Sequence, residues 1–415
     1  MFQSPETGGN NVDVSIVMPC LNEILSLPHC ISNASNALAR IALAYGFTGE
    51  IVIADNGSID GSQALAASLG ARVVPVIRKG YGAALIGGCE NAYGRYILMG
   101  DCDGSYDFTD GVEMIGHLAE GSALCMGSRF DGGIAPGAMP WKNRYIGNPV
   151  LTGILNLFFR SGIGDAHCGL RAIRKDVFSQ LGLASDGMEF ASEMIIKASL
   201  LGFDIRQVPA TLSPDLRNRP PHLRPWRDGW RHLRYLFMLS PTWVFGVPAL
   251  CSMMLAALIL MGATLHQLRF LPALGYFGDS WVIVGGFLAT LAHLSMVMAL
   301  ATHLHGVNQG YRRLRPLLER HGSKLTLETA LLTGSALIGL SVIGFGLTGW
   351  YWAKGGFVAL GSVLPVILSA VSGSIGAQTI LGGFLLSIIA GHKARVIETI
   401  IVPSLTEIQV SDLAA

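Results

Sequence analysis

Charged residues are scarce in this chain of 415 residues, and they are unevenly placed. Asp, Glu, Lys and Arg make up 14% of the sequence, against about 25% in an ordinary soluble domain. Only 15 of them lie after residue 239, and the mean hydropathy is +0.47. These values exclude intrinsic disorder and a wholly soluble chain. The sequence therefore predicts a soluble first part and a membrane-embedded second part.

The sequence also lacks an excess of positive charge, and it lacks cysteines at the close spacing of a metal-binding or redox motif. The 29 basic and 28 acidic residues leave a net charge of +1, which argues against a nucleic-acid binder that works through bulk charge. The seven cysteines are scattered without a CxxC motif, which favours a reduced, cytosolic setting. The N-terminus has no apolar run, so we expect residues 1–12 to form a flexible leader and no signal peptide.

Four uncharged stretches are long enough to cross a bilayer, which takes about 20 apolar residues. They cover residues 240–265, 280–302, 329–353 and 366–390, the last being part of a longer uncharged run. We expect an all-α membrane domain of four transmembrane helices over residues 240–392. A basic juxtamembrane segment, 216–239, would precede it, and a tail, 393–415, would follow.

The distribution of basic residues predicts the orientation of these helices. In the juxtamembrane segment 216–239, in the three loops between the stretches and in the tail, the counts of Lys and Arg are 6, 1, 5, 1 and 2. By the positive-inside rule, this alternation places the soluble part and the C-terminal tail in the cytoplasm.

Short apolar runs alternate with helical patterns over residues 13–215. We expect strands at 14–18, 50–54, 72–77, 96–99 and 123–126, with helices at 25–44, 62–69 and 82–93. Such alternation predicts an α/β domain with a Rossmann-like, mostly parallel sheet. Ligands bind at the carboxyl ends of the strands in such sheets, so the residues after each strand are the candidates for a site.

Acidic residues follow three of the first four expected strands, with glycines between them. Taken singly, Asp55 is explained as a helix cap, and Asp101 and Asp103 as solvated loop acids. Their coincidence at neighbouring strand ends instead favours a nucleotide and a metal. Two carboxylates at Asp101 and Asp103 suit Mg²⁺ or Mn²⁺, which prefer oxygen ligands and substrate phosphates.

Five segments occur in order along the chain: VSIVMPCLNE, ADNGSIDGS, RKGYGAALIGG, GDCDGSYDF and MGSRF. Together they resemble family-2 glycosyltransferases of the GT-A fold, most closely the dolichyl- or polyprenyl-phosphate mannose and glucose synthases. The resemblance covers residues 12–236. It implies inverting transfer of one hexose from a nucleotide-sugar, of the UDP-glucose or GDP-mannose type, to polyprenyl or dolichyl phosphate at the cytoplasmic face of the membrane.

The resemblance assigns roles to residues at matching positions. The residues that match the family's nucleotide-sugar site are Pro19, Asn22, Glu23, Asp55, Gly80, Ala83 and Asp101. Asp101 and Asp103 match its metal motif. Ser105 stands where the family often has a glutamine ligand, and we count it as a third candidate ligand because serine can ligate weakly or through water.

Four arginines are candidates for the acceptor phosphate. Arg129 matches the family's GSR motif, and its planar fork suits a phosphate. Arg171, in a segment that matches the family's CGFRA, is expected either to bind the phosphate or to serve packing. Arg217 and Arg219 precede the membrane, where a lipid phosphate would arrive, although both are equally explained as positive-inside charge.

Two glutamates one helical turn apart complete the candidate catalytic residues. In many family-2 enzymes, acids near Glu189 and Glu193 include the base for an acceptor hydroxyl. A phosphomonoester, with a second pKa of about 6, arrives already anionic, so we expect these glutamates to shape the site without acting as an obligate base. A surface pair with Lys197 is the alternative. The stretch 139–159, rich in aromatic and aliphatic residues, is expected either to lie in the membrane interface or to pack within the domain.

Two rival functions remain on the sequence alone. A processive polysaccharide synthase would carry Gln-x-x-Arg-Trp before its membrane helices, whereas this chain has Leu-Arg-Pro-Trp-Arg at 223–227, without the glutamine. A non-catalytic lipid-sugar translocation partner would not need the acidic pair, and both Asp101 and Asp103 are intact.

Overall fold

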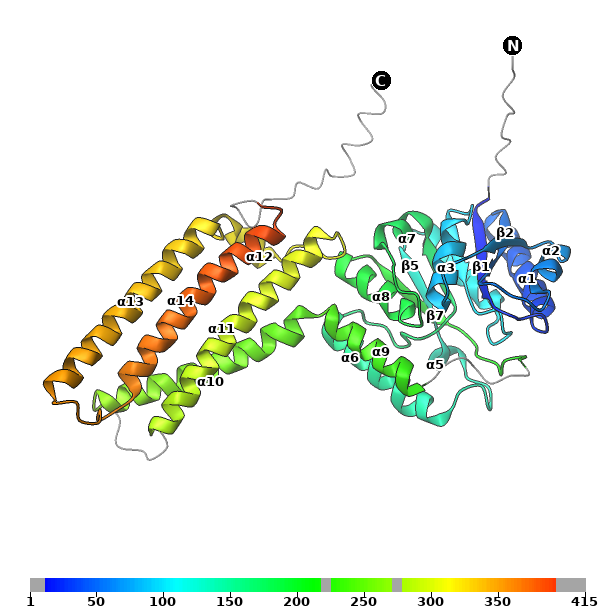
Figure 1. Ribbon diagram of the computed structural model, residues 1–415. Coiled ribbons are helices and arrows are strands. Elements are labelled where there is room, and N and C mark those ends of the chain that lie inside the picture. The colour runs from blue at the N-terminus through cyan, green and yellow to red at the C-terminus, as the bar shows by residue number, and fades with distance from the viewer. Residues whose placement is uncertain (1–11, 218–224, 271–277, 393–415) are drawn as a thin grey trace, which may run out of the picture. The chain divides into compact units, whose positions relative to one another are not determined.

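The computed structural model describes residues 12–217, 225–270 and 278–392, and it divides the chain into two compact units. The first unit is Met1–Leu239 and the second is Ser240–Ala415. Figure 1 shows a sheet with helices in the first unit and a bundle of long helices in the second. The expected leader and tail lie almost wholly outside the described residues.

A seven-stranded sheet forms the centre of the first unit, in the order β3-β2-β1-β4-β6-β5-β7. The strands are β1 (Val14–Cys20), β2 (Gly49–Asp55), β3 (Arg72–Pro75), β4 (Tyr96–Met99), β5 (Leu124–Ser128), β6 (Arg171–Arg174) and β7 (Ile205–Pro209). β6 runs antiparallel to both β4 and β5, and all other pairs are parallel. The five expected strands are present, whereas β6 and β7 were not anticipated.

Helices cover both faces of the sheet. The helices of this unit are α1 (Leu27–Tyr45), α2 (Ser62–Ser68), α3 (Tyr81–Glu90), α4 (Gly111–Ala119), α5 (Arg129–Gly132), α6 (Asn148–Phe159), α7 (Lys175–Leu181), α8 (Phe190–Leu201) and α9 (Pro225–Met238). Short turns η1 (Phe108–Asp110) and η2 (Asn143–Gly147) precede α4 and α6.

The alternation of side chains along β1 divides the core in two. Ile16 and Met18 pack with α1, α2 and α4, while Val17 packs on the other side with α3, α6, α7 and α8. A strand that is buried on both faces reads as one apolar run, which is why VSIVM marks the centre of the sheet. This sandwich fixes the carboxyl ends of β1, β2 and β4 at one edge.

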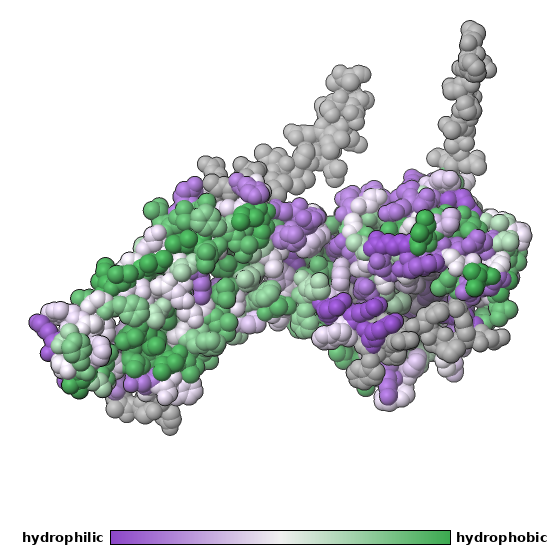
Figure 2. Space-filling model, viewed as in Figure 1, coloured by the Kyte–Doolittle hydropathy of each residue, from purple (hydrophilic) through white to green (hydrophobic). Residues whose placement is uncertain are grey.

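The second unit contains four helices that are long and apolar enough to cross a membrane. They are α10 (Val247–Gln267, preceded by η3, Thr242–Gly246), α11 (Asp279–Asn308), α13 (Leu327–Lys354) and α14 (Leu364–Ile389). The short elements α12 (Pro316–His321) and η4 (Gly322–Lys324) lie between α11 and α13. Apolar side chains cover much of the visible surface of this unit (Figure 2).

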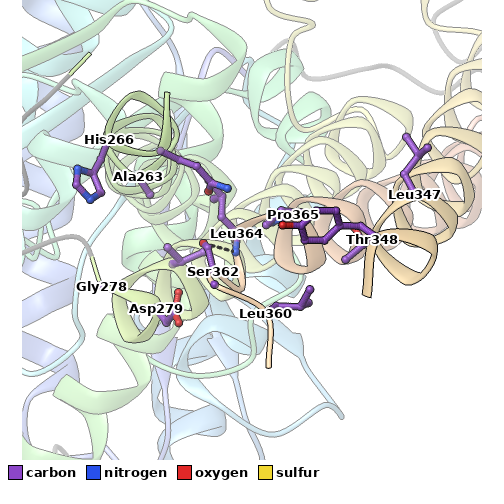
Figure 3. A pocket seen from close by; sticks show the side chains of 14 residues that line it. Ala263, His266, Gly278, Asp279, Leu347, Thr348, Leu360, Ser362, Leu364 and Pro365 are labelled. Atoms are coloured by element: carbon purple, nitrogen blue, oxygen red, sulfur yellow. Dashed lines mark hydrogen bonds between the residues drawn. The ribbon is translucent and has the colours of Figure 1, made fainter. Parts of the chain in front are cut away.

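Small residues let α13 and α14 approach closely. A Cβ added at Gly376 would lie 2.7 Å from the carbonyl oxygen of Gly334. Such small-residue contacts are how helices pack in lipid, where burial of apolar area gives no driving force. One end of this unit also holds a cavity of about 760 Å³, lined by side chains such as Asp279, Thr348 and Ser362 (Figure 3). None of the predicted site residues lies in it.

Candidate active site

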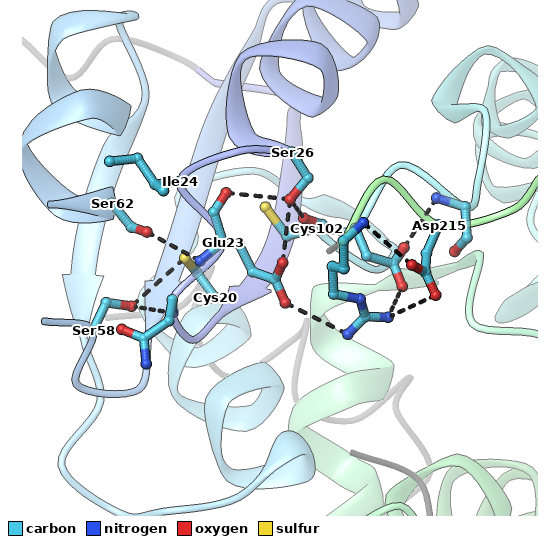
Figure 4. Close-up of polar contacts among 12 residues, drawn as sticks. Cys20, Glu23, Ile24, Ser26, Ser58, Ser62, Cys102 and Asp215 are labelled. Carbon is cyan, nitrogen blue, oxygen red and sulfur yellow. Dashed lines mark hydrogen bonds and ion pairs between the residues drawn. The ribbon is translucent and has the colours of Figure 1, made fainter. Parts of the chain in front are cut away.

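The loops after β1 and β4 are tied together by a buried serine. The Ser26 hydroxyl donates to the carbonyl oxygen of Cys102 at 2.7 Å and to Glu23 Oε2 at 3.2 Å. Figure 4 shows Glu23, Ser26 and Cys102 in contact. The structure thus brings the first predicted nucleotide loop directly beside the predicted metal motif.

Asp103 is a buried residue whose carboxylate is fixed by its own turn. The backbone N–H of Ser105 donates to Asp103 Oδ1 at 2.9 Å, and Gly104 between them has a φ of +80°. Glycine adopts this left-handed conformation without strain. The turn engages Oδ1 of Asp103 with the Ser105 amide and leaves Oδ2 outside it, and the Ser105 hydroxyl is a proposed third ligand.

Asp101 is more deeply enclosed than a solvated loop acid. Its Oδ1 is buried and finds no hydrogen-bond partner among the described residues, while a Cβ added at Gly169 would lie 2.9 Å from its Oδ2. Burial, and next the charge of Asp103, raise the pKa of Asp101 to about 6. An unpaired buried carboxylate oxygen is costly, so a cationic partner belongs at this position.

The acidic pair fits a divalent cation that is shared with a substrate. Among the described residues, no three His, Cys, Asp or Glu side chains gather closely enough to form a complete protein site. Mg²⁺ is commonly bound through only one or two carboxylates plus substrate phosphates and water. Asp101, with its orphaned oxygen, and Asp103 would hold such an ion.

Arg217 lies against this acidic pair. Its Nη2 contacts Asp103 Oδ2, and its Nη1 lies 3.5 Å from Glu23 Oε1. The side chain is 18% exposed. Of the two arginines predicted in this loop, Arg217 therefore reaches the site, whereas Arg219 lies outside the described residues.

Asp55 and Asn22 build the loop after β2. The Asp55 carboxylate accepts from the backbone N–H groups of Gly57 and Ser58 and, at 2.6 Å, from Gln63 Nε2. Asn22 Oδ1 accepts from the backbone N–H of Ile59 at 2.9 Å. Both side chains thus hold residues 55–61 in shape, and contact with a base or ribose would be additional.

Gly80 and Ala83 lie where α3 begins against the loop before α8. Gly80 has a φ of +136°, and a Cβ added there would lie 2.2 Å from the carbonyl oxygen of Asp186. That oxygen accepts from the backbone N–H groups of Gly82 and Ala83. Glycine is therefore required at position 80 by close backbone contact. Pro19, half-buried, lies at the carboxyl end of β1.

Arg129 forms a buried, two-pronged ion pair that the sequence did not reveal. Its Nε lies 2.7 Å from Asp165 Oδ2 and its Nη2 lies 2.8 Å from Asp165 Oδ1. Asp165 is fully buried and Arg129 is 7% exposed. The fork expected to hold a phosphate thus already holds a carboxylate, which leaves Nη1 as the nitrogen outside this pair.

Arg171 is bonded entirely to backbone carbonyl groups. Its Nε, Nη1 and Nη2 donate to the carbonyl oxygens of Cys168, Ala191 and Ala166 at 2.8, 2.6 and 3.0 Å. Burial lowers its pKa. Of the two roles expected for Arg171, the geometry favours packing, because it ties the loop before β6 to the start of α8.

Glu193 is buried in a structural ion pair, and Glu189 is not. Glu193 accepts from the backbone N–H groups of Ala184 and Ser185 and lies 2.7 Å from Lys197 Nζ. Burial alone would raise the pKa of Glu193, but the Lys197 ammonium and the amide donors hold it below its usual value. Glu189 Oε2 is buried, and no hydrogen bond reaches it from the part of the chain that the structure describes.

Comparison with known proteins decides the family. Residues 15–182 match the model of glycosyl transferase family 2, and residues 300–390 match the family-2 C-terminal transmembrane region. The chain is 33% identical over 378 residues to the low-salt glycan biosynthesis hexosyltransferase Agl6 of Haloferax volcanii, covering 90% of this chain and 88% of that protein. This chain belongs to glycosyltransferase family 2.

Other relatives share mainly the catalytic unit. The polyprenol monophosphomannose synthase of Mycolicibacterium smegmatis is 28% identical over 216 residues, covering 48% of this chain and 76% of that protein. The structure of glucosyl-3-phosphoglycerate synthase from Mycobacterium tuberculosis is similar over 55% of this chain and 78% of that protein's chain, at 20% identity and a TM-score of 0.40.

Family membership confirms three expectations from the sequence. This family-2 protein is a glycosyltransferase, its catalytic unit has the mostly parallel GT-A fold, and it is a membrane protein with a transmembrane C-terminal region. Sequence reasoning missed Asp165 and Tyr106, whose hydroxyl accepts from the Gly169 backbone N–H at 2.8 Å. Tyr106 lies in the GDCDGSYDF segment after the strand at 96–99, where the acids alone drew attention, whereas Asp165 follows no expected strand and had no positional signal.

Proposed function

We propose that this glycosyltransferase transfers one hexose from a nucleotide-sugar to polyprenyl phosphate at the cytoplasmic face of the membrane. The acidic pair of Asp101 and Asp103 carries the proposal. The buried Asp101 Oδ1, which no described residue hydrogen-bonds, lies at the carboxyl ends of the strands, where sheets of this kind bind their ligands. Two carboxylates there suit a cation that bridges a diphosphate.

The proposed reaction needs no general base from the protein. An oxygen of the acceptor phosphate forms the new bond to the anomeric carbon, while the bond from that carbon to the diphosphate oxygen breaks and its electron pair leaves with the nucleotide. A divalent cation, when bound, would neutralise charge on the leaving diphosphate. Because the phosphate is already anionic, Glu189 is not needed as a base.

A lipid acceptor is supported by the way the catalytic unit ends. α9 ends at Met238, and the first span begins at Thr242, so only three residues separate them. α6 packs beside α9, with the rings of Phe158 and Phe237 5.5 Å apart (Figure 1). Large apolar side chains from these two helices and the segment before α6 remain exposed: Trp141, Tyr145, Ile146, Val150, Leu157, Trp230, Phe237 and Met238.

Part of the stretch 139–159 also packs within the domain, since Leu155 and Phe159 join the core. One face of this stretch therefore packs within the domain, and we propose that the other lies in the membrane interface. The exposed apolar side chains, together with basic neighbours such as Lys142 and Arg144, suit a membrane surface. The cytoplasmic orientation is proposed from the basic-residue counts of 6, 1, 5, 1 and 2.

The test supplies membranes that contain the full chain with a panel of labelled nucleotide-sugars and with polyprenyl phosphate. We expect one UDP- or GDP-hexose to give a labelled lipid that carries a single sugar. Asp103→Asn should abolish it, whereas Glu120→Gln, at the end of α4 and the opposite edge of the sheet, should not. A polymeric product, or labelling that persists in Asp103→Asn, would contradict the proposal.

A further inference from the structure

The segment Ser213–Arg217, which we call the strap, lies across the turn that carries Asp103. The backbone N–H of Ser213 donates to the carbonyl oxygen of Ser105, and that of Leu216 donates to the carbonyl oxygen of Asp103, both at 2.9 Å. A Cβ added at Gly104 would lie 2.7 Å from Leu216 Cδ1. The strap is thus fixed by backbone bonds, and its last residue delivers a guanidinium to the acids.

Both oxygens of Asp103 are engaged in this arrangement. Oδ1 accepts from the Ser105 amide, and Oδ2 contacts Arg217 Nη2. A divalent cation that binds both Asp101 and Asp103 needs an oxygen of Asp103, and the guanidinium occupies the one outside the turn. The cation and Arg217 therefore compete for the same carboxylate.

Arg217 also neutralises charge that would otherwise accumulate. Glu23, Asp103 and, at 4.0 Å, Asp215 lie around the guanidinium as its ion-pair partners. Without a cation of some kind, three carboxylates would repel one another in a partly buried site. Arg217 supplies that cation in the resting chain.

We infer that Arg217 is a cation with two positions. In the resting protein it holds Asp103 and Glu23; when a divalent cation and the nucleotide-sugar bind, the guanidinium is displaced and becomes available to the acceptor phosphate. The second position rests on the proposed function. Substrate binding would therefore be ordered, because the acceptor phosphate can contact Arg217 only after the donor has bound.

The partial exposure of the Arg217 side chain and of its ion pairs makes this exchange physically reasonable. A partly exposed ion pair is worth about 1 kcal/mol or less, so a divalent cation with its diphosphate can displace it. The freed guanidinium presents five donors in a planar fork that matches a phosphate. The strap itself need not move, because its own hydrogen bonds are made by backbone atoms.

The first experiment measures Mn²⁺ binding to the purified full chain, with no sugar donor or acceptor, by the loss of the free-ion paramagnetic resonance signal. Removing the competing guanidinium in Arg217→Gln should tighten Mn²⁺ binding, roughly three- to fivefold for a pair of this exposure. Arg217→Lys should stay near wild type. Arg206→Gln, which breaks the exposed pair with Asp204 elsewhere on the unit, is the matched control and should not change binding.

Unchanged or weaker Mn²⁺ binding in Arg217→Gln, in a variant whose melting temperature matches wild type, would overturn the resting position. This readout needs no acceptor, so it stands even where transfer to polyprenyl phosphate is not observed.

The second experiment examines the other position by varying polyprenyl phosphate at saturating donor and Mn²⁺. Arg217→Gln should raise the KM for the lipid about ten- to a hundredfold, as expected for one lost charge-assisted bond. The donor KM should not rise. Tighter Mn²⁺ binding with an unchanged lipid KM would refute the second position and leave only a resting counter-ion.

Discussion

The buried pair of Arg129 and Asp165 gives the sharpest test of how this catalytic unit is held together. Asp165 receives the Arg129 backbone N–H at 3.1 Å as well as two guanidinium nitrogens, and it also accepts from the His167 backbone N–H at 3.3 Å. The substitution Asp165→Asn preserves shape but replaces one carboxylate oxygen with an amide donor. That donor would face a donor of Arg129, and the buried guanidinium would lose its counter-charge.

The size of the effect follows from burial. Arg129 is 7% exposed and Asp165 is not exposed at all, so solvent cannot replace the lost partner. Breaking a buried pair by removing one partner costs about 3–5 kcal/mol. For a domain of this size, each kcal/mol lowers the melting temperature by about 2–4 °C, so the catalytic unit of Asp165→Asn should melt roughly 6–20 °C below wild type.

Buried thiols provide an assay that reports on this unit alone. Six cysteines are buried and lie in the catalytic unit: Cys20, Cys30, Cys89, Cys102, Cys125 and Cys168. Burial raises the pKa of Cys125 to about 12 and that of Cys168 to about 11, which suppresses the reactive thiolate. A thiol-reactive fluorogenic dye on a Cys251→Ser background therefore reports unfolding of the catalytic unit, because Cys251, in α10, is the exposed thiol.

A double-mutant cycle separates the ion pair from other effects of the substitutions. Arg129→Met alone leaves a buried carboxylate with two backbone donors, and it should also be strongly destabilising. The combination Arg129→Met/Asp165→Asn should lose less stability than the sum of the two, with a coupling of about 2 kcal/mol or more. Melting of Asp165→Asn within 2 °C of wild type, or strictly additive losses, would refute the buried pair.

Three further predictions concern pH, close packing and topology. The pKa of Glu193 is lowered on folding, so its stabilisation is complete above the unfolded value of about 4.3 and is lost as pH falls through the lower, folded value. The melting difference between wild type and Glu193→Gln should therefore be constant from about pH 6 to 8 and shrink progressively as pH falls below about 4.3. Gly80→Ala should lower the melting temperature and raise the donor KM, because its Cβ would meet a backbone carbonyl at 2.2 Å. On the Cys251→Ser background, an impermeant maleimide on intact cells should label Val358→Cys but not Ala67→Cys, and the reverse pattern would invert the proposed topology.

The parallel half of the sheet was predictable because its signals are local. β1, β2 and β4 are apolar runs ended by Pro, Asp or Gly, and their parallel pairing follows from the helices between them. The same rule put Asp103 and Glu23 at one edge, where the structure has Ser26 joining Glu23 to the carbonyl oxygen of Cys102, the residue before Asp103. The four membrane helices were equally readable, since lipid requires long uncharged helices.

The other half of the sheet and the partners of the arginines were not predictable in this way. β6 has only four residues, Arg171–Arg174, with arginine at both ends, and it is a strand because β4 and β5 flank it. Asp165 pairs with Arg129 across 36 residues of chain, in a loop whose sequence carries no periodic signal. A motif can thus assign an arginine to a site, but only the fold shows which acceptor already holds it.

The partners of these arginines also indicate which of them is available to a substrate. The fork of Arg129 is held by Asp165, and the nitrogens of Arg171 are held by backbone carbonyls that belong to the scaffold. Moving either would leave a buried acceptor unsatisfied, which is costly. Arg217 differs, because two of its partners, Asp103 and Glu23, are themselves predicted to bind the cation and the nucleotide, and the third, Asp215, is exposed to solvent. When those ligands arrive, they replace what Arg217 gave to Asp103 and Glu23, so Arg217 is the arginine of the three that can turn to a phosphate without leaving a buried charge unpaired.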